Sequence, residues 1–89
     1  MLMTLKQVYD QIQRDLKNGV ENNRYDNVPL HHLRGTVWLV NDMEARKIVF
    51  QFRDRFGIFY DGEIDLDTFG KLKIKKMVNE IKRQVKEGL

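Results

Sequence analysis

The sequence predicts an α+β domain: a helix, an antiparallel β-meander of three or four strands and a second helix, with both helices packed on one face of the sheet. Two observations carry this prediction. Apolar residues recur with a period of 3.6 near both ends of the chain, whereas they alternate with a period of two in the middle. The length of 89 residues suits a single domain, 1–89, with a small core.

The first helix is expected from Thr4 to Asn18, because apolar residues at positions 5, 8, 9, 12 and 16 share one helical face. Thr4 and Gln7 have the spacing of a capping box, in which each side chain bonds the backbone of the other residue. Gly19 is expected to end the helix, since glycine adopts a positive φ without a steric clash.

The stretch 20–35 is polar, rich in Asn and Asp, and contains the only proline, Pro29. It is expected to be a long loop, which is either packed on the body or functional.

A period of two begins at Thr36 and indicates antiparallel strands. The clearest alternation puts Ile48, Phe50 and Phe52 on one face. The pair Asp61-Gly62 is expected to form a type I′ hairpin turn. The strands are therefore expected at 36–40, 46–53 and 56–60, with a short fourth strand at 63–66.

The last helix is expected to begin between Thr68 and Leu72 and to end at Gly88. Apolar residues at positions 74, 77, 78, 81, 85 and 89 share its buried face.

The composition argues against an enzyme. The chain has neither cysteine nor serine, which removes disulfides and the usual nucleophiles. His31 and His32 are adjacent, so they have neither the i, i+4 spacing of helical metal ligands nor the i, i+2 spacing of ligands on a strand. We therefore expect no catalytic residues, no metal, no cofactor and no small-molecule substrate.

The first residues show no secretory signal and no apolar run is long enough to span a membrane, which favours a cytoplasmic protein without a membrane partner.

The net charge of +3 is unevenly distributed along the chain. Residues 1–35 carry +1, residues 36–67 carry −3 and residues 68–89 carry +5. Six of the seven cations of the last segment gather opposite its apolar face, and they are Lys71, Lys75, Lys76, Lys82, Arg83 and Lys86. Such a face neutralises the phosphates of a nucleic acid or another polyanion, is simply solvated, or lies on a membrane surface, which is the least favoured of the three because the apolar stripe is needed for the core. The favoured function is a small non-enzymatic nucleic-acid-binding protein that uses this face.

The alternative function is a protein–protein interaction through the sheet, as in accessory or inhibitory proteins of mobile elements. Two of the expected strands are apolar on both faces, and an uncovered apolar face usually marks an interface. Its partner is another protein or a second copy in a homodimer. The aromatic residues of this face, together with Lys47 and Arg53, would also suit the stacking of single-stranded bases. In a third interpretation, Val28, Leu30 and Leu33 of the 20–35 loop cover this face. The candidate interface residues are Trp38, Val40, Val49, Phe59 and Tyr60.

Overall fold

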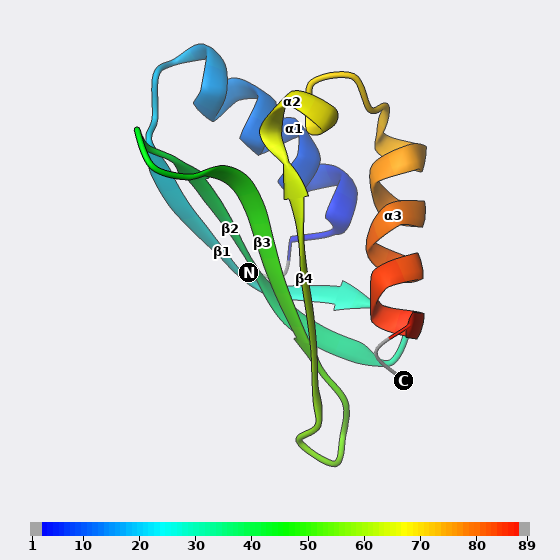
Figure 1. Ribbon diagram of the computed structural model, residues 1–89. Helices are drawn as coiled ribbons and strands as arrows, with labels where there is room; N and C mark the ends of the chain where they lie inside the picture. The colour runs from blue at the N-terminus through cyan, green and yellow to red at the C-terminus, as the bar shows by residue number, and fades with distance from the viewer. Residues whose placement is uncertain (1–2, 88–89) are drawn as a thin grey trace.

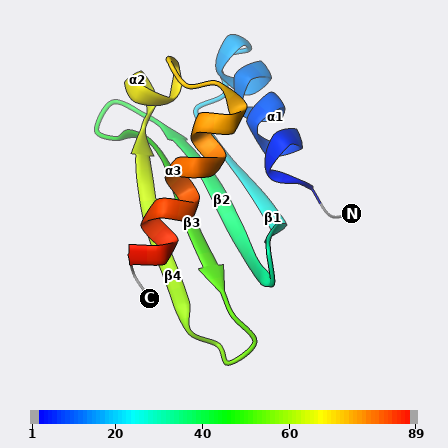
Figure 2. The same ribbon diagram turned by 90° about the vertical axis from the view of Figure 1, so that its right-hand side faces the viewer.

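The computed structural model describes residues 3–87 and shows a four-stranded antiparallel sheet in the order β1-β2-β3-β4, with the helices on one face (Figures 1 and 2). The predicted fold class is confirmed. The elements are α1 (Leu5–Lys17), β1 (Asn22–Leu30), β2 (Leu33–Asn41), β3 (Arg46–Arg53), β4 (Phe59–Asp65), α2 (Leu66–Phe69) and α3 (Ile74–Glu87).

The predicted capping box opens α1. The amide of Thr4 donates to Gln7 Oε1 at 2.9 Å, and the amide of Gln7 donates to Thr4 Oγ1 at 3.2 Å. Gly19 follows the helix with φ 75°, as expected for its end.

The expected loop at 20–35 is wrong: most of it is β1, which pairs with β2 through a turn at His31 and His32. The pairing register shifts between Tyr25 and Val28, where Asn27 has φ 57°. This bulge interrupts the alternation that identifies a strand in a sequence. Val28, Leu30 and Leu33 are buried on the helix-covered face, so they do not cover the other one.

The predicted turn at Asp61-Gly62 is also wrong. Both residues lie inside β4, where Gly62 pairs with Phe50. A Cβ on Gly62 would lie 2.7 Å from Phe50 Cζ, so the Phe50 ring leaves room only for a glycine at this position. The chain turns earlier, over Asp54–Ile58, with Gly57 at φ 80°. The expected strands at 56–60 and 63–66 are therefore not separate strands: residues 59–60 and 63–65 belong to the single strand β4, residues 56–58 lie in the turn, and Leu66 begins α2.

The final helix is split into a short α2 and a longer α3. Asp65 caps α2 by accepting from the amide of Thr68. The break explains why Leu72 falls outside the apolar stripe of α3, and the expected end at Gly88 lies outside the described residues.

The core lies between the sheet and the helices. Its largest fully buried side chains are Phe50, Phe52 and Phe69, and the apolar faces of α1 and α3 pack against them through Ile12 and Ile81. Burying one such side chain contributes ~2–3 kcal/mol. Within residues 3–87, every helix is too short or too polar to cross a membrane.

Candidate functional site

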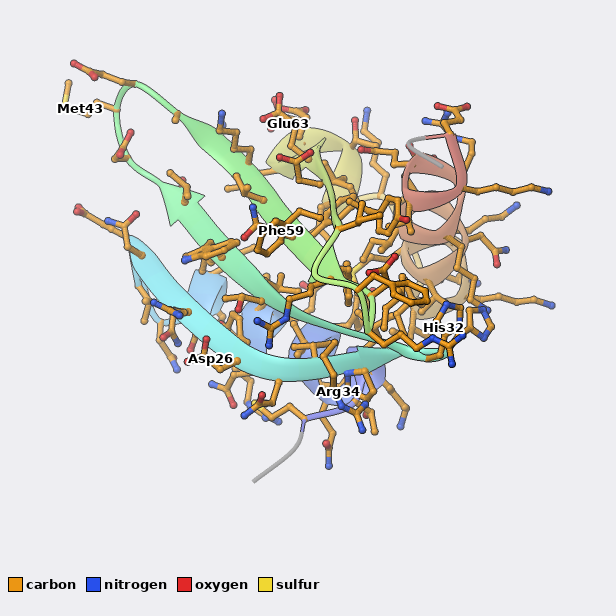
Figure 3. All side chains as sticks on the ribbon, turned by 90° about the horizontal axis from the view of Figure 1, so that it is seen from below. Asp26, His32, Arg34, Met43, Phe59 and Glu63 are labelled. Carbon is orange, nitrogen blue, oxygen red and sulfur yellow. The ribbon has the colours of Figure 1, made fainter. Side chains whose placement is uncertain are left out.

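The predicted cations of α3 divide between the two ends of the helix. Lys82 and Lys86 lie in its second half and line a pocket of about 410 Å³ together with His31 and His32 of the β1–β2 turn. Figure 3, which looks at this end of the molecule, shows His32 beside α3. The structure thus joins part of the predicted basic face to residues some fifty positions away in the sequence.

Arg83 lies between two carboxylates. Its guanidinium contacts Glu80 at 2.5 Å and Glu87 at 2.7 Å. Hydrogen bonds from Arg83 and Gln84 lower the pKa of Glu80, so its negative charge is retained. These contacts largely neutralise Arg83.

The remaining predicted cations lie near the start of α3. Lys71 precedes the helix, and Lys75 and Lys76 occupy its first turn. Lys76 borders a hollow of about 410 Å³ between α3 and β4 whose lining includes Glu63, Asp65 and Glu80. Carboxylates around this hollow disfavour a phosphate there.

Two arginines on the open face of the sheet lie directly opposite each other. Arg34 of β2 and Arg53 of β3 are cross-strand partners, and both are exposed. Neither guanidinium forms an ion pair with any residue in the described range 3–87. Like charges in this position destabilise a sheet, and the repulsion is relieved when an anion binds between them.

These arginines continue into the turn that follows β3. A hollow of about 330 Å³ is lined by Arg34, Arg53 and Arg55 together with His32, Asp54 and Gly57. Because His32 lines this hollow and the pocket beside α3, the two cationic groups meet at one end of the molecule. We call this surface the basic end, and it comprises His31, His32, Arg34, Arg53, Arg55, Lys82 and Lys86.

Asp54 is the carboxylate that lines both hollows of the basic end. Its Oδ1 accepts from the amides of Phe56 and Ile58, and its Oδ2 accepts from the hydroxyl of Tyr60 at 3.1 Å. Desolvation opposes its ionisation, but these hydrogen bonds outweigh that effect and hold the pKa of Asp54 below its ordinary value. Asp54 therefore folds the turn and reduces the positive charge around it.

The β3–β4 hairpin carries exposed apolar side chains at this same end. Phe56 is 73% exposed, Phe59 is 57% exposed and Ile58 is 53% exposed. The guanidinium of Arg55 lies 4.8 Å from the centre of the Phe56 ring. Figures 1 and 2 show the hairpin extending beyond the rest of the sheet. Rings beside arginines form the combination that stacks bases while holding phosphates.

The open face of the sheet holds four of the five predicted interface residues. Trp38, Val40 and Val49 are half-buried, and Trp38 is the cross-strand partner of Val49. Phe59 lies on the same face, at the start of β4, and its cross-strand partner on β3 is Arg53. Tyr60 is separated from these four, because it is buried on the helix-covered face.

The open face of the sheet carries positive charge near the basic end and negative charge along β4. Near the basic end, a hollow of about 400 Å³ is lined by Arg34, Arg53 and Phe59 among other residues, and also by Arg24, which forms an ion pair with Asp26 at 2.7 Å. Along β4, Asp61, Glu63 and Asp65 are exposed in alternation, and Lys47 forms an ion pair with Glu63 at 3.0 Å. Lys47, which the sequence grouped with Arg53 beside the aromatics, is therefore neutralised, whereas Arg53 is not.

The sequence missed Arg34 and Arg55 as members of a site. Arg34 lies in the stretch that is expected to be a loop, and Arg55 lies between the strands expected at 46–53 and 56–60. A detectable signal was the density of cations around the turn, with Arg53 and Arg55 flanking Asp54.

No family model matches the chain, and comparison with curated proteins and with solved structures finds no match. Within residues 3–87, no three His, Asp or Glu side chains gather as metal ligands would.

Proposed function

We propose that the protein is a small non-enzymatic nucleic-acid-binding protein whose contact surface is the basic end. The phosphates of a single strand lie along Lys82, Lys86, Arg34 and Arg53, and neighbouring bases stack on the exposed rings of the β3–β4 hairpin. Contacts with the backbone position a strand without reading its sequence. Compared with the face expected from the sequence, this surface keeps Lys82 and Lys86 and adds the arginines of the sheet.

The observation that carries this proposal is the adjacency of Arg34 and Arg53. Two guanidinium groups on neighbouring strands, neither of which forms an ion pair within residues 3–87, are costly in the free protein and favourable around a phosphate. Phe59 lies beside Arg53 and supplies an aromatic surface for a base. A single strand fits this arrangement better than a duplex, whose bases are already stacked.

The experiment measures binding of a 12-nucleotide oligothymidylate by fluorescence anisotropy over a series of salt concentrations. The variant Arg34→Gln/Arg53→Gln should reduce the affinity and lower the slope of log K against log salt by ~0.7, the value for the one phosphate held between the two arginines. Since the variant removes a repulsion, it should unfold at a denaturant concentration at least as high as the wild type.

The matched control is Arg46→Gln/Lys47→Gln, which removes two cations at the opposite end of β3 from Arg53. Arg46 and Lys47 form ion pairs with Asp67 and Glu63, so their removal should leave the slope unchanged. The proposal is contradicted if the wild type fails to bind at low salt or if the control weakens binding equally.

A second candidate function is contact with a partner protein, or with a second copy of the chain, across the open face. It is favoured by the position of Trp38, which lies opposite Val49 on a face that no described helix covers. Light scattering tests self-association directly. A strict monomer whose Trp38 emission is that of a buried indole would argue against an interface on this face.

A further inference from the structure

The pocket beside α3 differs from the rest of the basic end because its floor is apolar. Three separate segments contribute the floor: Leu30 and Leu33 flank the β1–β2 turn, Tyr60 comes from β4 and Val85 comes from α3. Its volume of about 410 Å³ lies within the range of small-molecule sites, ~300–1,000 Å³.

The floor is held in place by the core. Leu30, Leu33, Tyr60 and Val85 are each between 4% and 8% exposed, so most of each side chain is packed against neighbours. The hydroxyl of Tyr60 donates to Asp54, which fixes the ring. The pocket therefore exists before a ligand arrives, and filling it requires little reorganisation.

The rim of the pocket is cationic. Lys82 and Lys86 lie one helical turn apart on α3 and thus next to each other on its surface. Within residues 3–87 neither ammonium forms an ion pair. The Asp54 carboxylate also lines the pocket, but it already accepts three hydrogen bonds. A ligand that suits this pocket has an apolar body and negative charge at its edge.

We propose that the pocket receives one unstacked nucleotide of a bound single strand. Its base lies against the floor, and the phosphates on either side lie at Lys82 and Lys86. This inference rests on the proposed function and adds to it a defined position for one base. Phosphates alone would gain nothing from an apolar floor, whereas every base has an apolar face that gains from burial there.

The experiment compares a 12-nucleotide oligothymidylate with a strand of equal length built from abasic units, which has the same phosphates. The wild type should bind the oligothymidylate at least ~10-fold more tightly, because the base in the pocket contributes about that increment and the bases stacked on the hairpin rings add to it. Isotope-edited NMR should detect contacts between thymine protons and the methyl groups of Leu33 and Val85.

Two variants distinguish the pocket from the hairpin rings. Val85→Phe fills the pocket, and it should reduce the preference for oligothymidylate over the abasic strand while the salt slope stays unchanged. Phe56→Ala should retain the NMR contacts between the thymine protons and the methyl groups of Leu33 and Val85. Circular dichroism and urea unfolding check that each variant folds, and the wild-type NMR contacts test the pocket independently of both.

Several results would overturn the inference. Equal affinity for both strands, or a preference that is lost with Phe56→Ala and kept with Val85→Phe, would mean that the pocket takes no base while the phosphate contacts stand. If free thymidine monophosphate bound as tightly as the oligothymidylate, the pocket would be a site for a free nucleotide and not for one nucleotide of a strand. Failure of both strands to bind would remove the proposed function itself.

Discussion

The side-chain amide of Gln84 on α3 binds both backbone groups of Glu63 on β4. Its Oε1 accepts from the Glu63 amide at 3.1 Å, and its Nε2 donates to the Glu63 carbonyl at 3.0 Å. Because β4 is an edge strand, these groups would otherwise be free to pair with another chain. Gln84 thus takes the place of a neighbouring strand at this position of the β4 edge.

Replacing Gln84 by Ala should lower the free energy of unfolding by ~1–2 kcal/mol, since two backbone groups lose their partner. It should also promote self-association through the β4 edge. Urea unfolding and light scattering measure the two effects. Gln13→Ala is the control, because Gln13 is exposed on α1, and equal behaviour of the two variants would contradict this role of Gln84.

Asp15 is the buried carboxylate that joins α1 to β1. It accepts hydrogen bonds from Tyr25, Asn23 and Gln11. Desolvation raises its pKa, but these hydrogen bonds outweigh burial and hold the pKa below the ordinary value of 3.8. Its ionised form therefore stabilises the fold above that value, and the stabilisation disappears as the pH falls through the lowered pKa.

Asp15→Asn should lower the free energy of unfolding by ~1–3 kcal/mol at pH 7, because the amide cannot accept all three hydrogen bonds. The difference in the free energy of unfolding between Asp15→Asn and the wild type should become smaller when urea unfolding is repeated towards pH 2. Asp10→Asn on the same helix should change stability little at either pH. A gap between wild type and Asp15→Asn that stays constant with pH would contradict the assignment.

Gly35 allows β2 to pass close to β3. A Cβ there would lie 2.5 Å from the backbone oxygen of Gln51 and would overlap the Phe52 ring. Gly35→Ala should therefore destabilise the protein by ~3 kcal/mol. Gly70→Ala should change stability by less than ~0.5 kcal/mol, because Gly70 has a helical backbone and a methyl group there would make only ordinary van der Waals contacts, at 3.5 Å from the Leu66 oxygen and 3.7 Å from the Asp67 oxygen. Equal melting temperatures for the two variants would contradict this role of Gly35.

The parts of the fold that follow a strict period were predictable from the sequence, and the irregular parts were not. α1, α3 and β3 keep their apolar periodicity throughout. β1 breaks its alternation at a bulge, and Pro29 and its Asn and Asp residues are typical of loops. Asp61-Gly62 has the composition of a turn, but the contacts that make Gly62 necessary in β4 come from Phe50 and Gln84, which are distant in the sequence.

The candidate site was predictable to a smaller extent. Helical periodicity alone places Lys82 and Lys86 on one surface. The meeting of Arg34 with Arg53 depends on the β2–β3 register, and that register depends on packing across the whole sheet. Arg83 fits the helical pattern equally well, but its neutralisation by Glu80 and Glu87 depends on side-chain conformation.

Asp54 offers a test of charge at the basic end with little change in shape. Asp54→Asn retains an oxygen that can accept from the amides of Phe56 and Ile58. Removing the negative charge should increase affinity for oligothymidylate about threefold at low salt, consistent with a surface charge contribution below ~1 kcal/mol. Glu44→Gln, in the β2–β3 turn, makes the same charge change elsewhere and should leave the affinity nearly unaltered. An Asp54→Asn affinity equal to or below that of the wild type would contradict the prediction.

The most direct test of a nucleic-acid interface at the basic end compares two double substitutions on α3. Lys82→Gln/Lys86→Gln and Lys75→Gln/Lys76→Gln remove the same charge from the same helix, and only the first pair borders the His31–His32 turn. The measurement is the salt dependence of oligothymidylate binding. The first variant should lose affinity ~10-fold and lower the slope by ~1.4, while the second keeps the wild-type slope. An equal loss in both variants, or a loss confined to Lys75→Gln/Lys76→Gln, would contradict the basic end as the binding surface.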